Sequence, residues 1–320
     1  MDRHRARGRR ARPSRRTPLL SVAVASVVLV GATAAGTVYV KAQAHDGTAA
    51  VSSAAPASPS ASPAGSEEAS VEPVAEPSAD RDALLAKALK SVTAAAGAKT
   101  SVAVLDVDSG ESAAHGDAAF DTASIVKVNI LAALLLQAQD ADRHLTAREK
   151  TYATAMIENS DNASASALWA AIGRADGLDA ANRRFGLTST QGGDGDLWGL
   201  TQTTAGDQLK LLRQVFGKDS RLSASSRSYV QGLMGEIEAD QQWGVSAAAD
   251  GSQWALKNGW LARSTTGLWD VNSIGRISAN GREYLVATLS NGNSTQAKGI
   301  SLVEAVSKAA VSAFRDTAED

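Results

Sequence analysis

A serine and a lysine three positions apart, Ser124 and Lys127, open an apolar stretch that runs to Ala138. Residues at this spacing lie on one face of a helix, one turn apart, so the hydroxyl and the amine can meet. A serine hydroxyl becomes a nucleophile when a base takes its proton, and a lysine among apolar neighbours can be that base because burial lowers its pKa. The alternative is a helix-capping serine beside a lysine that extends toward solvent. For this pair taken alone, both interpretations stay open.

Two further motifs carry side chains that suit the same chemistry. Ser160 and Asn162 flank an aspartate in a predicted loop, where a hydroxyl can relay a proton and an amide can bind a substrate amide. The segment Lys257-Asn258-Gly259-Trp260 ends a predicted strand, where the lysine offers a positive charge for a carboxylate and the glycine lets a substrate approach the strand edge. Each motif has an ordinary alternative, the first as turn and capping residues and the second as the exit from a strand. Their order along one chain favours a shared site.

The segments around these motifs predict one domain of mixed helices and strands. The expected helices are Arg81–Ala96, Ser124–Ala138, Ala147–Glu158, Ala163–Ile172, Ala175–Phe185, Thr204–Phe216, Ala224–Ile237 and Ser301–Phe314. The expected strands are Ser101–Asp106, a return strand after Gly110, Gln253–Lys257, Gly267–Ile277 and Glu283–Leu289. Early strands, a block of helices and late strands imply one antiparallel sheet on which the helices pack, an α+β fold.

The composition limits the domain and excludes several kinds of site. All seven prolines lie before residue 78, so residues 81–320 are proline-free and are expected to form a single catalytic domain. The chain has no cysteine, which excludes disulfides, cysteine nucleophiles and cysteine-ligated zinc. Its four histidines share no helical face, so neither a metal nor another cofactor is expected. Beyond residue 16 the net charge is −9, which argues against a nucleic-acid partner, and we expect a monomer.

The first eighty residues have the pattern of an export and tethering segment. Residues 1–18 form a basic stub that is predicted to stay in the cytoplasm. Leu19–Val40 is a run of 22 residues without a charge, long enough to cross a bilayer, so we expect a membrane anchor with the catalytic domain outside the cytoplasm. The alternative is a cleaved signal segment, with Ala42-Gln43-Ala44 as the cleavage site and a secreted product. Residues 41–80, rich in Ala, Ser and Pro, are expected to be a disordered linker.

With three motifs in this order, Arg81 to Phe314 resembles the serine β-lactamase and penicillin-binding superfamily, in particular its class A β-lactamase-like branch. The resemblance implies an antiparallel sheet flanked by helices, with an inserted all-helical lobe. It implies that Ser124 is the acylated nucleophile, Lys127 its activating partner and Ser160 the proton shuttle. It also implies that a β-lactam or a peptidoglycan-derived substrate is bound by Asn162, Lys257, Asn258, Gly259 and Trp260. Lys257 would hold the carboxylate, and the main-chain N–H groups of Ser124 and Trp260 would form the oxyanion hole.

Departures from the family pattern bear on turnover. Class A β-lactamases carry a glutamate in the loop between the second and third motifs, where it activates the deacylating water. Here the corresponding stretch, Gln191–Leu200, offers only Asp194 and Asp196. The threonine of the third motif is Asn258, and no arginine occurs from Gly267 to Ile274. We therefore expect acylation followed by slow deacylation, and the alternative is a catalytically silent penicillin-binding module on the same fold.

Overall fold

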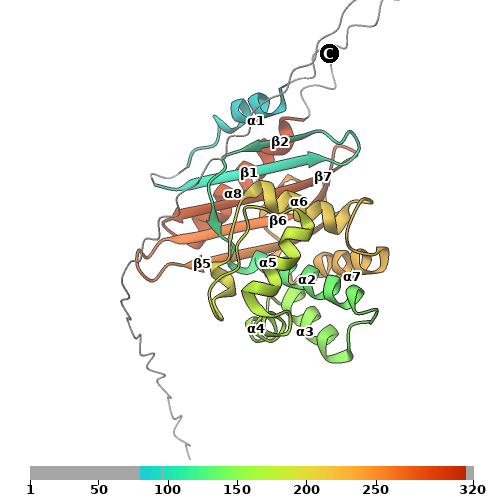
Figure 1. The fold of residues 1–320 in the computed structure, drawn as a ribbon. Coiled ribbons are helices and arrows are strands. Elements are labelled where there is room, and N and C mark those ends of the chain that lie inside the picture. The colour runs from blue at the N-terminus through green and yellow to red at the C-terminus, as the bar shows by residue number, and fades with distance from the viewer. Residues whose placement is uncertain (1–79, 95–96, 315–320) are drawn as a thin grey trace, which may run out of the picture. The chain divides into compact units, whose positions relative to one another are not determined.

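A five-stranded antiparallel sheet lies at the centre of the computed structural model, which describes residues 80–94 and 97–314 (Figure 1). Across the sheet the strands follow the order β2-β1-β7-β6-β5, and every neighbouring pair is antiparallel. Their bounds are β1 Lys99–Asp106, β2 Ser112–His115, β5 Trp254–Ala262, β6 Trp269–Ala279 and β7 Arg282–Asn293. Early and late strands therefore share one sheet, as predicted, and β5 lies at its edge.

Turn residues set the register between neighbouring strands. Asn280 and Gly281 join β6 to β7 with φ values of +51° and +73°. Two-residue hairpin turns of this kind require left-handed backbone, which Asn and Gly adopt at low cost. Between β1 and β2, the Asp106 carboxylate accepts the N–H groups of Asp108 and Ser109 at 2.9 and 3.1 Å. This is an Asx turn, in which the side chain replaces a main-chain acceptor.

Each face of the sheet has its own hydrophobic core. Along β1, Ala103 and Leu105 join the core on one face and Val102 and Val104 join the core on the other, as the alternation of a strand requires. Helices α1 (Arg81–Leu89) and α8 (Gln296–Ser312) pack on the second of these faces. The first face is covered by α6 (Ala205–Phe216), which contacts β1, β6 and β7.

An all-helical lobe continues from that first face. Figure 1 shows its helices gathered below the β5 edge of the sheet. They are α2 (Val126–Asp140), α3 (Ala147–Glu158), α4 (Asn162–Ala171), α5 (Arg174–Phe185) and α7 (Ala224–Gly235). Twelve residues of α2 are buried, so this helix is the core of the lobe, as a sequence that is apolar on almost every side predicts.

Several predicted elements have the wrong bounds. Helix α8 begins at Gln296 and not at Ser301, and strand β7 continues to Asn293 and not only to Leu289. Helix α1 ends at Leu89 and not at Ala96, because Ser91 donates its hydroxyl to the carbonyl of Ala88 and so competes with helical hydrogen bonding. Strand β5 runs five residues beyond Lys257, to Ala262. A second, two-stranded sheet, formed by β3 (Phe120–Asp121) and β4 (Gln202–Thr203), is not predicted from the sequence pattern.

The predicted membrane segment, Leu19–Val40, and the linker up to residue 79 lie outside the described residues. In the part of the chain that the structure covers, no helix combines the length and the apolarity that a membrane crossing needs.

Candidate active site

The predicted nucleophile, Ser124, lies in the short 3₁₀ turn η1 (Ala123–Ile125) that leads into α2. Ala123 has a φ of +47°, a left-handed conformation that is uncommon for a residue with a side chain. The side chain of Ser124 caps neither this turn nor α2, so the capping interpretation is wrong. Ser124 is half-buried.

Side chains from two strands, β6 and β4, and from the residue that follows β5 hold the segment that enters η1. Asn272 of β6 is fully buried and donates its amide to the carbonyls of Asp121 and Thr122 at 2.9 and 3.0 Å. The Asp121 carboxylate is ion-paired with Arg263, just after β5, and accepts the side-chain amide of Gln202 from β4. Burial raises the pKa of Asp121, and the nearby guanidinium opposes that shift. These contacts tie the nucleophile turn to the edge of the main sheet.

Lys127 is fully buried, and all its hydrogen bonds go to the second motif. Its Nζ donates to the carbonyl oxygen of Ser160 at 2.6 Å, to Ser160 Oγ at 3.0 Å and to Asn162 Oδ1 at 2.8 Å. Burial lowers the pKa of Lys127 to about 7, and the negative charge of Asp161 opposes the shift. A lysine with this pKa is partly neutral near pH 7, as a general base must be.

The second motif lies between α3 and α4. Asp161 caps α4 by accepting the N–H of Ser164 at 2.7 Å, so the capping interpretation holds for this residue. Ser160 has a φ of +55°, and its Oγ lies 3.0 Å from the Nζ atoms of both Lys127 and Lys257. Strained backbone of this kind concentrates at functional sites.

Lys257 reaches the same hydroxyl from β5. It is fully buried, and its Nζ also donates to the carbonyl of Asn258 at 3.0 Å and to Gln241 Oε1 at 3.4 Å. Burial lowers the pKa of Lys257 well below its usual value, and the positive charge of Lys127 lowers it further. Two amines on either side of one hydroxyl offer a route by which a proton can move across the site.

The third motif lies inside β5, so its interpretation as a strand exit is wrong. Asn258 and Gly259 are paired with the facing residues of β6. A Cβ on Gly259 would stand 2.6 Å from the main-chain nitrogen of Ser124 and 2.9 Å from the carbonyl oxygen of Thr122. Glycine is therefore needed here because β5 lies directly against the nucleophile turn.

Asn258 and Trp260 lie on the face of β5 opposite Lys257. Asn258 is fully buried and donates its amide to the carbonyls of Gln241 and Trp243 at 2.6 and 2.9 Å. The half-buried Trp260 ring lies 5.9 Å from that of Trp243, centroid to centroid. Asn258 thus holds the segment that follows α7, and its role in substrate binding, like that of Trp260, stays a prediction.

The loop between α5 and α6 brings a tryptophan to Lys127. Trp198, in the turn η2 (Trp198–Leu200), places its ring centroid 5.0 Å from Lys127 Nζ. Its Nε1 donates to Ser166 Oγ of α4 at 3.1 Å. None of the three sequence motifs predicts this contact. The available signal was an aromatic residue inside a glycine-rich loop that had to approach the site.

The two acids of this loop are directed elsewhere. Asp194 is exposed, and Asp196 is exposed and ion-paired with Arg174 at 2.9 Å. An open groove of about 560 Å³ separates the loop from the end of β5, lined by residues 196–200 and 261–265. The side of the loop that faces Lys127 therefore presents an indole and no carboxylate.

Comparison with known proteins agrees with this arrangement. The solved structure of PBP-A is 20% identical over 73% of this chain and 96% of its own, with a TM-score of 0.63. The extended-spectrum β-lactamase TLA-1 is 17% identical over 73% of this chain and 98% of its own, with a TM-score of 0.63. A β-lactamase from Xanthomonas campestris pv. campestris is 20% identical over 73% and 97%, with a TM-score of 0.58. No curated protein matches the chain significantly.

At these identities the solved structures show a shared fold, which confirms the predicted fold class. The family model described as the β-lactamase enzyme family matches residues 84–152 and 144–314, which include all three motifs. The predicted resemblance is therefore confirmed, and the chain belongs to the β-lactamase enzyme family.

Proposed function

We propose that this protein is a serine hydrolase that forms an acyl-enzyme on Ser124 with β-lactam or peptidoglycan-like substrates. The observation that carries the proposal is the Ser160 hydroxyl, which lies 3.0 Å from both Lys127 Nζ and Lys257 Nζ. A serine, two amines with lowered pKa values and a shared hydroxyl are the groups that acyl transfer to serine needs.

Acylation then proceeds by addition to the substrate carbonyl, followed by loss of the leaving nitrogen. The Ser124 oxygen adds to the substrate carbonyl as neutral Lys127 takes the hydroxyl proton. The carbonyl oxygen becomes an oxyanion that the main-chain N–H groups of Ser124 and Trp260 would stabilise. The amide C–N bond then breaks, and the leaving nitrogen receives a proton through the Ser160 hydroxyl. The result is an ester on Ser124 and a free amine on the other product, or on the opened ring of a β-lactam.

The substrate class follows from the charge at the far end of the site. Lys257 is buried with amide and hydroxyl oxygens as its hydrogen-bond acceptors, and none of these acceptors supplies a negative charge for the protonated amine. A substrate carboxylate near this amine would supply the missing negative charge and favour the protonated form. The relatives support this class, since one solved variant of PBP-A is an acyl-enzyme complex with penicillin G.

Turnover is expected to be slow, because neither Asp194 nor Asp196 faces Lys127. Steady-state hydrolysis of a chromogenic cephalosporin by the full chain measures this directly. We expect a burst of one product per enzyme followed by slow release. Fast turnover that is lost in Asp194→Ala or Asp196→Ala would contradict the proposal and identify the base that activates water.

We further propose that the enzyme acts outside the cytoplasm and is held at the membrane by Leu19–Val40. The support is the uncharged length of that run and the arginine-rich stub before it. Fractionation of cells that produce the full chain, with sequencing of its amino terminus, tests the tether. We expect the protein in the membrane fraction, whereas a soluble exported protein that begins near His45 would show cleavage instead.

A further inference from the structure

We propose that Trp198 sets the lifetime of the acyl-enzyme by keeping water away from the Lys127 side of Ser124. The inference rests on the proposed acylation of Ser124 and adds to it a residue that controls the second half of the reaction. It begins from the tryptophan ring 5.0 Å from Lys127 Nζ, inside a loop that offers this lysine no carboxylate.

The indole is held in place from three directions. Its Nε1 donates to Ser166 Oγ at 3.1 Å, which fixes the ring on α4. The turn that carries it packs against the nucleophile turn, where a Cβ on Gly199 would lie 4.0 Å from Ala123 Cα. The Lys127 amine lies over the face of the indole ring. Trp198 therefore lies between α4, which carries the second motif, and η1, which carries the nucleophile.

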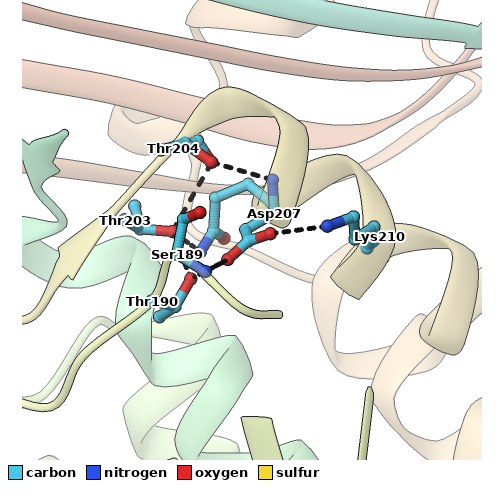
Figure 2. A network of polar contacts seen from close by, with 7 residues as sticks. Ser189, Thr190, Thr203, Thr204, Asp207 and Lys210 are labelled. Atoms are coloured by element: carbon cyan, nitrogen blue, oxygen red, sulfur yellow. Dashed lines mark hydrogen bonds and ion pairs between the residues drawn. The ribbon is translucent and has the colours of Figure 1, made fainter. Parts of the chain in front are cut away.

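The loop itself is closed at its neck, so the ring cannot move away as part of a flexible segment. Gln191 and Gln202 exchange two main-chain hydrogen bonds, each of 2.9 Å. Beside them the buried Asp207 carboxylate accepts the N–H of Ser189 at 2.7 Å and the hydroxyl of Thr190 at 2.9 Å (Figure 2). The second oxygen of the same carboxylate accepts Lys210 Nζ at 2.9 Å (Figure 2).

The tip of the loop is fastened as well. Trp169, a buried residue of α4, donates its Nε1 to the carbonyl of Gly195 at 2.8 Å. The N–H of Gly192 is bound by the Asp179 carboxylate at 2.8 Å. Neck and tip together hold Trp198 in one position, which a residue must keep if it is to exclude solvent.

Hydrolysis of the ester needs space and a base at this position. A water must add to the ester carbonyl and give one proton to a base, the C–O bond to Ser124 must break, and the serine oxygen must take a proton back. The products are the free acid and the restored hydroxyl. An indole beside Lys127 occupies volume that such a water would use and offers no group to take its proton. The ester is thereby protected on this side.

The experiment separates the two halves of the reaction. The full chain and its variants are mixed with excess penicillin G, the mass of the intact protein is followed until the adduct is complete, free penicillin is removed, and loss of the adduct is timed. Trp198→Ala is expected to lose the adduct about tenfold faster than wild type, below the 10²–10⁴-fold of a positioned base. Trp198→Phe keeps an aromatic ring at the position but loses the hydrogen bond to Ser166, so its adduct lifetime should lie between those of wild type and Trp198→Ala.

Two further variants test the placement of the ring. Ser166→Ala removes only the hydrogen-bond acceptor of the Trp198 indole, and we expect a shorter adduct lifetime in this variant too. If Trp198→Ala does not fold, the lifetime in Ser166→Ala tests the inference in its place. Asp194→Ala alters an exposed side chain of the same loop and should leave the lifetime unchanged.

An adduct whose lifetime is the same in wild type, Trp198→Ala and Ser166→Ala would overturn this inference while leaving acylation intact. Absence of any adduct on the wild-type protein would overturn the proposed function, and the inference with it. The two failures are therefore distinguishable in one data set.

Discussion

The variant Lys127→Ala is expected to be acylated by penicillin about 10²–10⁴-fold more slowly than the wild-type protein, the range that a positioned general base contributes. The Lys127 amine lies one turn from Ser124 with its pKa lowered by burial to about 7, so it can take the hydroxyl proton near neutral pH. Without it, the serine hydroxyl has no basic side chain of this kind on its own helix. The rate of adduct formation, followed by intact mass under single-turnover conditions, measures the effect.

The fold of this variant is expected to survive, because removing a buried charge need not destabilise a protein. Lys150→Ala, which removes an exposed lysine from α3, is the matched control and should acylate at the wild-type rate. Thermal unfolding of both variants shows whether each is folded. Wild-type acylation by a folded Lys127→Ala would mean that this lysine is structural and that another group activates Ser124.

As the pH is raised from 5 toward 7, the acylation rate of the wild-type protein should rise about tenfold per pH unit, and above pH 7 it should level off at a plateau about 100-fold above the rate at pH 5. The direction of this pH dependence follows from the role of the Lys127 amine as a base. Below its pKa of about 7, Lys127 is protonated and cannot accept the serine proton, and above that value it is neutral and can. Burial lowers this pKa, and the carboxylate of Asp161 counteracts the shift.

Asp161→Asn gives the pH experiment an internal check. This change removes the negative charge that supports protonated Lys127, so the midpoint of the acylation profile should move to lower pH. The asparagine can still cap α4 through its side-chain oxygen. A profile that is flat from pH 5 to pH 7, or a midpoint that moves upward in Asp161→Asn, would contradict the assignment of Lys127 as the base.

Much of this site could be predicted from sequence because its chemistry depends on short spacings. Helical spacing places Ser124 and Lys127 one turn apart, and the sequence around them is so largely apolar that burial of the lysine follows from it. Ser160 and Lys257 are far apart in the chain, and only the order of the three motifs indicated that they meet. The antiparallel sheet could be predicted in the same way, from early and late strands around a block of helices.

What could not be predicted depends on contacts between segments. Gly259 ends a strand by its sequence pattern, yet β5 continues to Ala262 because its residues stay paired with β6. Glycine stands at this position because the nucleophile turn packs where a side chain would be. Asn258 is polar and next to the site, but its amide is bound by two main-chain carbonyls on the other face of the strand. Trp198 needs the closed neck of its loop before it can reach Lys127. Each of these contacts joins two segments that are separated in the sequence.

The central claim is that Ser124 becomes acylated, and the mass of the intact full chain after incubation with penicillin G tests it most directly. We expect the mass to increase by one penicillin per protein, and peptide mapping to locate the adduct on Ser124. The adduct should persist for many minutes and be absent from Ser124→Ala. An unchanged mass in the wild-type protein, with the penicillin intact, would contradict the account and favour a silent penicillin-binding module on the same fold. An adduct retained in Ser124→Ala would contradict it as well, because the nucleophile would then be a different residue.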